Sequence, residues 1–303
     1  LAGVCIFLVF KLRLLNELYA ITDLVMCRLR QWEFLGFTLK GDLPQMAKWI
    51  RFDYQEKTTI GTLSGDTVSE YKGGLFDSPQ PTGRSMPLAD VQLKAPLVPH
   101  SIFALWNNFH ERAQKESQTL PDVPLYFMKP ITSVIGPGQT IYRPRGHHGR
   151  VIFEAELGIV LGSTCREISE EEAGQYIFGY TCVNDVTAIE FLFEDKAFQQ
   201  WTRCKGFDTF TPLGPWITTG IDPDGLQIMA LQGDKVRQDY PVSDMIFSPM
   251  KIVSLMSHYH TLLPGDLICC GTSVGARTMK PGTSIDIVIP GIGKLSNPFD
   301  DLP

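Results

Sequence analysis

Two glutamates stand two residues apart inside an apolar segment, "VIFEAELGIVLG", which runs from Val151 to Gly162. The segment is rich in Val, Ile, Leu and Phe and ends at glycine, which is typical of a β-strand. Side chains two apart on a strand share a face, so the carboxylates of Glu154 and Glu156 are expected to project together. The apolar residues are expected on the opposite face: Phe153, Ala155, Leu157, Ile159 and Leu161.

Two like charges held side by side in a half-buried place need compensation, because they repel each other and lose hydration. Water, an arginine or a metal ion could supply it. The alternative interpretation is a solvated strand face. A third carboxylate favours the metal, since "GYTCVNDVTA" ends a strand-like segment with Asn184 and Asp185. Three carboxylates from neighbouring strands form an all-oxygen set that suits Mg²⁺ or Mn²⁺ and leaves positions for water and a chelating substrate.

A lysine follows in "QWTRCKGFDTFTPLGPW", where Lys205 stands among aromatic residues and glycine. A partly buried ammonium group there could meet an anionic ligand. Further on, "GTSVG" matches the nucleophile elbow of α/β-hydrolases. That site needs a following helix and a later histidine, but Pro281 and Gly282 come soon after, and the last histidine is His260. The motif is therefore interpreted as a glycine-rich turn whose backbone can approach a ligand carboxylate.

The composition is that of an ordinary globular protein, with 303 residues, 44% hydrophobic and 20% charged. The net charge of −6 argues against a nucleic-acid partner. The seven cysteines contain no C-x-x-C pair, which indicates reduced thiols and a cytoplasmic location. We expect no membrane-spanning segment.

The first 45 residues differ from the rest. They open with "LAGVCIFLVF", which is about half the roughly 20 apolar residues that a bilayer span needs. We expect residues 1–45 to be an upstream extension or partial leader outside the mature fold, with the ordinary protein starting at Met46. An amphipathic helix on a membrane surface is the competing hypothesis.

Residues 46–97 predict a small β-rich N-terminal domain. Its short strands are "IRFDY", "TTIGTL" and "DTVSEY", and a Pro/Gly-rich connector is expected over residues 78–87. Further on, helices are expected within residues 101–118, within 169–180 with Ser169 as N-cap, and near "SPMKIVSLMSHYH" with Pro249 at the first position. Strands dominate without regular β-α alternation, so the predicted class is α+β and strand-dominated, not a doubly wound parallel sheet.

An ordered set of motifs closely resembles the fumarylacetoacetate hydrolase family over roughly residues 97–300: "LYFMKP", "GPGQTI", "FEAELGIVLG", "GYTCVNDVTA", "QWTRCKGFDTFTPLGPW", "GDLICCGTSVG" and "MKPGTSIDIVIPGIGKLSNP". The segment "MAKWIRFDY…GTLSGDTV" is similar to that family's usual N-terminal start. The resemblance implies a mixed β-roll core that holds Mg²⁺ or Mn²⁺, usually in a homodimer, with residues 98–303 as the catalytic domain.

The resemblance also implies a set of site residues. The family's active-site lysine falls on Lys205, and the lysine of its F-x-K segment falls on Lys129. Its G-T-x-x-G turn, near the substrate carboxylate, falls on Gly271 and Thr272. Its three metal carboxylates fall on Glu154, Glu156 and Asp185.

Family members cleave, decarboxylate, hydrate or isomerise 2-oxo acids and β-diketo acids. The implied function is therefore a hydrolase, lyase or isomerase acting on an anionic 2-oxo dicarboxylate or acylpyruvate through a metal-stabilised enolate. Such reactions belong to the catabolism of aromatic compounds or 2-oxo acids. The alternative is a non-catalytic, metal-holding dimer that binds a small carboxylic acid.

In many relatives a lid histidine lies in N-Y-x-x-H-x-x-E, and His110 aligns with it. The sequence departs from this motif, because the first two positions hold Trp106 and Asn107 and the last holds Ala113. We keep His110 as a candidate base, with a purely structural histidine as the alternative. A second departure is Ile189, where many relatives have arginine. The weakened motif favours decarboxylation or isomerisation, because neither needs an activated water.

Overall fold

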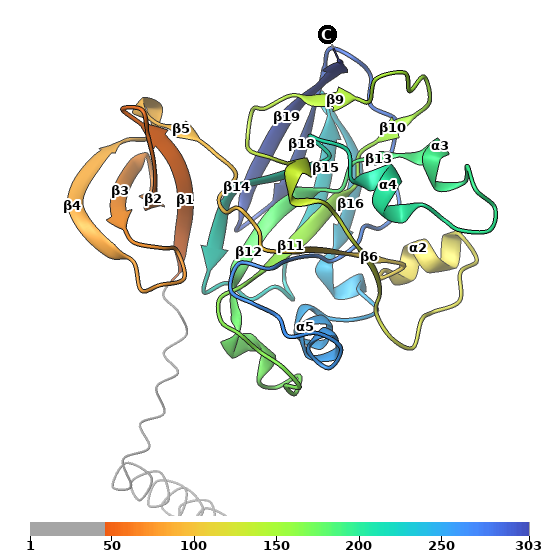
Figure 1. Cartoon of the computed structure of the whole chain (residues 1–303), viewed down its shortest axis with the longest axis horizontal. Helices are drawn as coiled ribbons and strands as arrows, with labels where there is room; N and C mark the ends of the chain where they lie inside the picture. The colour runs from red at the N-terminus through yellow and green to blue at the C-terminus, as the bar shows by residue number, and fades with distance from the viewer. Residues whose placement is uncertain (1–45, 303) are drawn as a thin grey trace, which may run out of the picture. The chain divides into compact units, whose positions relative to one another are not determined.

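The computed structural model describes residues 46–302 (Figure 1). The expectations about an upstream extension, a leader or a membrane-surface helix concern residues 1–45 and lie outside the described residues. Strands make up most of the regular structure, which confirms the predicted strand-dominated class. No helix within residues 46–302 is long and apolar enough to cross a membrane.

The N-terminal part is built from antiparallel hairpins that follow one another along the chain. Its strands are β1 (Ala47–Tyr54), β2 (Lys57–Ser64), β3 (Thr67–Lys72), β4 (Gln80–Pro87) and β5 (Gln92–Leu93). They enclose a small core of buried apolar side chains: Ile50, Phe52, Leu63, Val68 and Met86. The connector expected over residues 78–87 is instead mostly strand β4. It tolerates Pro81 because β4 pairs only with β3 and ends the sheet, where a missing N–H breaks no ladder.

The main sheet continues from β1 into the rest of the chain, in the order β4-β3-β2-β1-β14-β12-β11-β17-β6-β7. Most neighbours are antiparallel, but β17 and β6 run parallel, as do β8 and β14. The sheet is therefore mixed, as expected. The added strands are β6 (Ile102–Trp106), β7 (Leu125–Met128), β8 (Val134–Ile135), β11 (Ala155–Leu161), β12 (Ile177–Asn184), β14 (Thr211–Thr219) and β17 (Leu267–Cys269).

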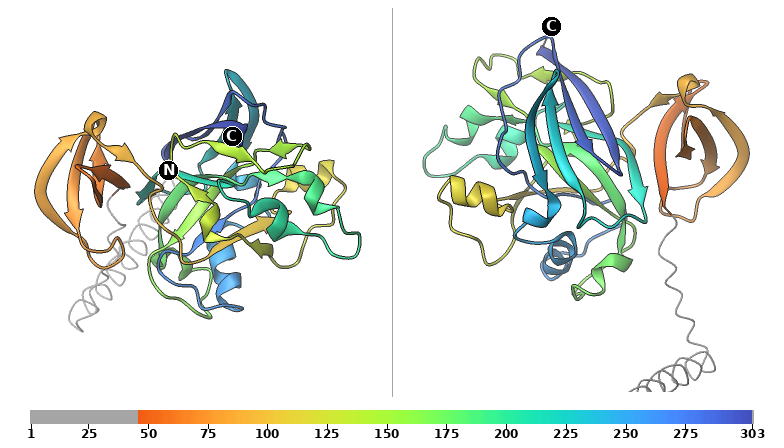
Figure 2. Two further views of the ribbon diagram at one scale, coloured as in Figure 1. Left: turned by 45° about the horizontal axis from the view of Figure 1, so that its top comes forward. Right: turned by 180° about the vertical axis from the view of Figure 1, so that it is seen from behind.

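A second sheet has the order β16-β15-β18-β19-β9, and Figure 2 shows it from behind. Its strands are β9 (Ile141–Arg143), β15 (Gln227–Gln232), β16 (Lys235–Pro241), β18 (Thr283–Ile289) and β19 (Gly293–Asp301). The largest apolar core joins the two sheets, because Leu157 and Ile159 of β11 belong to the same buried cluster as Ile228 of β15 and Ile287 of β18. A short pair, β10 (Val151–Ile152) and β13 (Thr187–Ala188), completes the strands.

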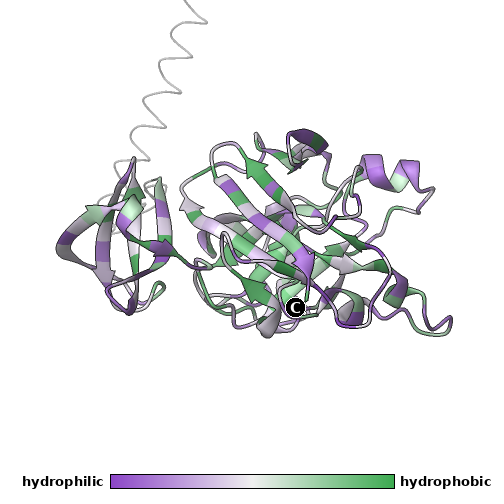
Figure 3. Ribbon diagram, turned by 90° about the horizontal axis from the view of Figure 1, so that it is seen from above, coloured by the Kyte–Doolittle hydropathy of each residue, from purple (hydrophilic) through white to green (hydrophobic). Residues whose placement is uncertain are grey.

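The helices are short. In the described part of the chain they are α2 (His110–Lys115), α3 (Ile189–Leu192), α4 (Trp201–Lys205) and α5 (Pro249–Ser257), with 3-10 turns at Leu88–Asp90, Ile131–Ser133, Ala173–Gln175 and Val242–Asp244. α5 begins as predicted, with Pro249 first and the Ser248 hydroxyl accepting from the N–H of Lys251 at 3.2 Å. Along the strands hydrophobic and hydrophilic residues alternate, whereas α2 is mainly hydrophilic (Figure 3).

Two predicted helices are shorter than expected. Within residues 101–118 the first half forms strand β6, because its apolar residues are buried between β17 and β7, and only α2 is helical. At Ser169 the expected cap exists, since its hydroxyl accepts from the N–H of Glu172 and the Glu172 carboxylate accepts from the N–H of Ser169. Only a turn follows, because pairing with β11 draws the chain into strand β12 from Ile177.

Candidate active site

The segment with the two glutamates is interrupted where one continuous strand was predicted. Phe153 and Glu154 lie between β10 and β11, and only Glu156 is within a strand. The N–H of Glu154 donates to the Asn184 side-chain oxygen at 3.0 Å, and its carbonyl accepts from the N–H of Asp185 at 2.9 Å. This irregular stretch ties the end of β12 to the start of β11, so the third carboxylate comes beside the first two.

The three predicted metal carboxylates are brought together and buried. Glu154 is 5% exposed, and Glu156 and Asp185 are each 1% exposed. One carboxylate oxygen from each of the three residues lies within 4.8 Å of the other two. The solvated-face alternative is therefore wrong. The apolar residues predicted on the opposite face share one core cluster: Phe153, Ala155, Leu157, Ile159 and Leu161.

Two buried lysines offset part of this negative charge. Lys205, at the end of α4, donates through Nζ to Oε2 of Glu154, to Oδ2 of Asp185 at 2.5 Å and to the Asp185 carbonyl at 3.4 Å. Lys129, just after β7, donates through Nζ to Oδ1 of Asp185 and to the Phe210 carbonyl at 2.8 Å. The ammonium of Lys129 thus contacts a predicted metal ligand.

The electrostatics follow from burial and from these contacts. Burial raises the pKa of Glu156 well above its ordinary value, and the charge of Asp185 raises it further. Burial opposes ionisation of Asp185, but the ammonium groups of Lys129 and Lys205 outweigh it and lower its pKa. Burial alone would lower the pKa of Lys205, yet the charges of Asp185 and Glu154 raise it above its ordinary value. Glu156 is thus the carboxylate that most needs another positive charge.

The glycine-rich turn that was predicted at Gly271 and Thr272 contacts Glu156. The N–H of Gly271 donates to Oε2 of Glu156 at 2.9 Å. Gly271 has φ +85°, a conformation that side chains rarely adopt, and a Cβ there would lie 3.2 Å from the Leu105 carbonyl. The hydroxyl of Thr272 donates to the Ala155 carbonyl at 2.8 Å and accepts from Nε2 of Gln238 at 2.9 Å.

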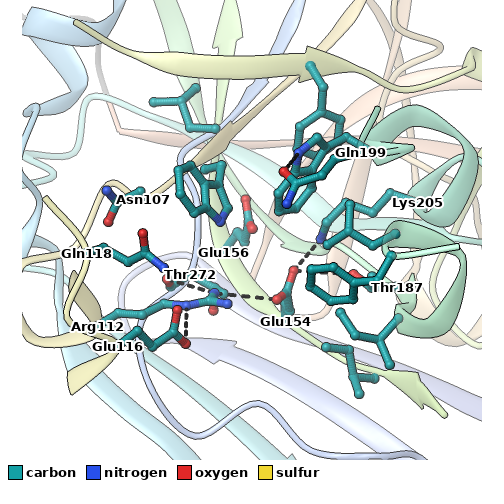
Figure 4. A pocket seen from close by; sticks show the side chains of 18 residues that line it. Asn107, Arg112, Glu116, Gln118, Glu154, Glu156, Thr187, Gln199, Lys205 and Thr272 are labelled. Carbon is teal, nitrogen blue, oxygen red and sulfur yellow. Dashed lines mark hydrogen bonds and ion pairs between the residues drawn. The ribbon is translucent and has the colours of Figure 1, made fainter. Parts of the chain in front are cut away.

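A cavity of about 290 Å³ opens onto this cluster (Figure 4). Four of the predicted site residues line it: Glu154, Glu156, Lys205 and Thr272. The cavity is not lined by Asp185, Lys129 or Gly271. Instead, Lys129 donates to Asp185, and Gly271 donates to Glu156. The remaining lining residues include Ile189, which confirms that an apolar side chain stands there.

His110 lies outside the cavity. It is the exposed first residue of α2, and none of the cavity-lining residues between 46 and 302 is a histidine. Arg112 lines it instead, because two residues of helix turn a side chain by about 200°. Its Nε donates to Glu116 at 3.1 Å, and its Nη1 lies 3.4 Å from both Oε1 of Glu154 and the Thr272 carbonyl. The role of His110 as a base stays a prediction that its position does not support.

Sequence reasoning missed Arg112, although a signal was present. If the motif N-Y-x-x-H is aligned two residues further along the chain, Asn108 and Phe109 take its first two positions. Arg112 then takes the position of the histidine. The structure supports this register. Asn108 is buried, donating to the Cys270 carbonyl at 2.9 Å and accepting from the N–H of Phe247 at 2.9 Å, and Phe109 is fully buried.

The donor set fits a hard divalent cation. Three buried carboxylates supply only oxygen ligands, and each oxygen keeps an acceptor site beyond its lysine contact. The residues that would hold Mg²⁺ or Mn²⁺ are Glu154, Glu156 and Asp185. Added positive charge would also offset the repulsion that raises the pKa of Glu156.

Comparison with known proteins shows which family the chain resembles. A family model described as "Fumarylacetoacetate (FAA) hydrolase C-terminal" matches residues 101–300, and one described as "Rv2993c-like, N-terminal" matches residues 47–96. Protein Rv2993c of Mycobacterium tuberculosis is 39% identical over 242 residues, which cover 79% of this chain and 90% of that protein.

Two solved structures are informative. The 5-carboxymethyl-2-hydroxymuconate delta-isomerase from Mycobacterium smegmatis is 35% identical, with a TM-score of 0.78 over 84% of this chain and all of that one. The maleylpyruvate hydrolase from Sphingobium sp. SYK-6, solved with manganese(II) ion and pyruvate, is 25% identical, with a TM-score of 0.70 over the same shares. The relatives thus include both an isomerase and a hydrolase.

Proposed function

The chain belongs to the fumarylacetoacetate hydrolase family, and from this premise we propose that it is a Mg²⁺- or Mn²⁺-dependent enzyme acting on a 2-oxo acid. The observation that carries the proposal is the buried set of Glu154, Glu156 and Asp185, of which the two glutamates line a cavity together with Lys205. The manganese ion and pyruvate in the Sphingobium hydrolase structure support both the metal class and the substrate class.

When bound, the cation would supply Lewis-acid chemistry by drawing electron density from the ketone oxygen of the substrate. The chain's own groups do the rest. The carboxylates of Glu154, Glu156 and Asp185 would hold the cation, and Gly271 orients Glu156. Lys205 is fixed by Glu154 and Asp185, so its charge is in place before negative charge develops on the substrate.

The lining of the cavity favours decarboxylation over hydrolysis. Hydrolysis of a C–C bond needs a base that activates water, and no histidine lines the cavity in the part of the chain that the structure describes. In decarboxylation of a 2-oxo acid with a carboxylate β to the ketone, the C–C bond to that carboxylate breaks and CO₂ leaves. The electron pair forms the enolate, which then takes up a proton at carbon. Isomerisation is the second candidate, because it uses the same enolate.

A panel of substrates separates the reactions. We expect the protein with Mn²⁺ to convert oxaloacetate to pyruvate and CO₂, to stop with EDTA, and to regain activity with Mg²⁺ or Mn²⁺. Because free metal ions also decarboxylate oxaloacetate, the control is Glu154→Gln protein at the same metal concentration. Turnover of acetylpyruvate or fumarylpyruvate instead would mean hydrolysis, and turnover of a 2-hydroxymuconate-type dienoate would mean isomerisation.

The alternative of a non-catalytic binding protein makes a different prediction. Such a protein would bind Mn²⁺ and a chelating acid such as oxalate, yet turn over none of the panel. Metal-dependent turnover of any one substrate, absent from the Glu154→Gln control, would exclude it.

We also propose that the chain forms a homodimer through the outer edge of β7. This strand ends the main sheet, and three exposed apolar side chains lie on it or close after it: Leu125, Met128 and Ile131. An unpaired edge with apolar side chains is a surface that another chain readily covers. Light scattering should give twice the mass of one chain, and Met128→Glu should lower it. A wild-type monomer would contradict the proposal.

A further inference from the structure

Two cations line the cavity, Lys205 and Arg112, and their hydrogen bonding differs. The Nζ of Lys205 faces three acceptors, which engage all three of its donors. The guanidinium of Arg112 has five N–H donors, and its Nε and Nη1 contact Glu116, Glu154 and the Thr272 carbonyl. Its Nη2 meets no acceptor among residues 46–302. Arg112 is therefore the cavity cation with donors left for a ligand.

Arg112 is held in place before any ligand arrives. The carboxylate of Glu116, four residues later, accepts from Nε. The Glu154 carboxylate and the Thr272 carbonyl both contact Nη1. The start of α2 is anchored because Asn108 and Phe109 are buried in the core. Ordering a free arginine would cost conformational entropy on binding, and most of that cost is already met here.

The wall formed by and just after α3 carries no charge. Ile189, Leu192 and Phe193 line the cavity there, and Trp106 and Trp201 add aromatic surface. A carboxylate on a substrate tail would lose hydration against these side chains without gaining a partner. At the Arg112 side it would meet a guanidinium whose Nη2 still has N–H donors to give, so a charge-assisted hydrogen bond could form there.

We propose that Arg112 binds a second carboxylate of the substrate and so restricts this enzyme to 2-oxo dicarboxylates; the inference rests on the proposed function. The 2-oxo carboxylate end lies at Glu154, Glu156 and Asp185. Since Nη1 of Arg112 is only 3.4 Å from Oε1 of Glu154, the second carboxylate lies close to that end, which favours short substrates. In this chain Arg112 is thus a specificity-determining residue where relatives carry a lid histidine.

Binding of matched ligands to the Mn²⁺-loaded protein tests the proposal without relying on turnover. 2-Oxoglutarate and 2-oxopentanoate share a head and a chain length and differ in the distal carboxylate. The distal carboxylate of 2-oxoglutarate is not β to its ketone, so that ligand is not consumed. By calorimetry, wild-type protein should bind the dicarboxylate at least about tenfold more tightly, as expected for a charge-assisted pair. A second pair, 2-oxopimelate and 2-oxoheptanoate, repeats the comparison with a longer carbon chain.

Arg112→Met should abolish the preference while leaving the affinity for 2-oxopentanoate within about threefold, since Met keeps much of the apolar stem. Arg112→Lys should retain part of the preference because it keeps the charge. Arg166→Met, which removes an exposed arginine from a surface ion pair with Glu167, should change nothing. Unchanged Mn²⁺ affinity in all three variants would show that the carboxylate cluster is intact.

Two outcomes would overturn the inference, and they are distinguishable. Wild-type and Arg112→Met proteins could prefer the dicarboxylate equally at both chain lengths, or wild-type protein could have no preference. In either case Arg112 does not bind the second carboxylate, although the proposed function stands. If wild-type protein binds neither the dicarboxylates nor the monocarboxylates in a Mn²⁺-dependent way, the proposed function fails and the inference fails with it.

Discussion

The guanidinium of Arg112 lies against the carboxylate of Glu154, with Nη1 3.4 Å from Oε1, while the other oxygen of that carboxylate accepts from Lys205. Glu154 thus stands between two cations that come from different helices, α2 and α4. The same carboxylate is a proposed metal ligand, so its charge would hold a cation as well as the lysine and the arginine. Variants of these residues should separate their roles.

Glu154→Gln should remove the cation while keeping the shape of the side chain. We expect Mn²⁺ affinity to fall by more than about 100-fold, because a neutral amide replaces an anionic ligand. Isothermal titration calorimetry measures this directly. Glu171→Gln, an exposed glutamate, is the matched control. Equal Mn²⁺ affinities for the two variants would exclude Glu154 as a ligand.

Lys205→Met should separate metal binding from catalysis. Its ammonium supplies a fixed charge but no metal ligand, so Mn²⁺ binding should persist while turnover falls at least about 100-fold. Steady-state rates at saturating substrate, together with Mn²⁺ titration, test this. If the rate stays within a few-fold of wild type, Lys205 is only a structural counter-ion to Asp185.

His110→Ala should leave kcat and KM within about twofold, because His110 is exposed at the start of α2 and does not line the cavity. The measurement is a pH profile of kcat/KM for wild-type and variant protein. A loss above tenfold, with a change in the shape of that profile, would show that α2 moves His110 into the site.

Glu156→Gln should stabilise the metal-free protein. The folded-state pKa of Glu156 is raised, so the unfolded chain ionises first and wild-type stability falls as pH rises from about 4.3 toward that raised value. Glutamine does not titrate, so the variant should be more stable than wild type at neutral pH, with little gain near pH 4. Urea unfolding at pH 4 and 7 checks the sign, and a variant that is less stable at pH 7 would contradict it.

Much of the carboxylate cluster could be predicted from sequence because residues two apart on an extended segment share a face, which favours Glu154 and Glu156 lying together. The interruption at Phe153 and Glu154 could not be predicted, since there Glu154 donates its N–H to Asn184 and accepts from the N–H of Asp185, both distant in the chain. Strand β4 was missed for a related reason. Its prolines suggest a connector unless the strand is known to lie at an edge.

The lid helix shows the limit of motif matching more sharply. Both His110 and Arg112 are polar residues of one short helix, and only the burial of Asn108 and Phe109 fixes which of them faces the cavity. Lys129 shows another limit, because sequence cannot tell an ammonium that meets substrate from one that meets Asp185. Such choices depend on tertiary contacts and not on local pattern.

The most direct test of the central claim is a crystal of the protein soaked with Mn²⁺ and oxalate, measured for anomalous scattering. We expect one strong manganese peak within bonding distance of Glu154, Glu156 and Asp185, with oxalate chelating the ion on the cavity side. A peak elsewhere, or none at these carboxylates when calorimetry shows Mn²⁺ bound, would contradict the account.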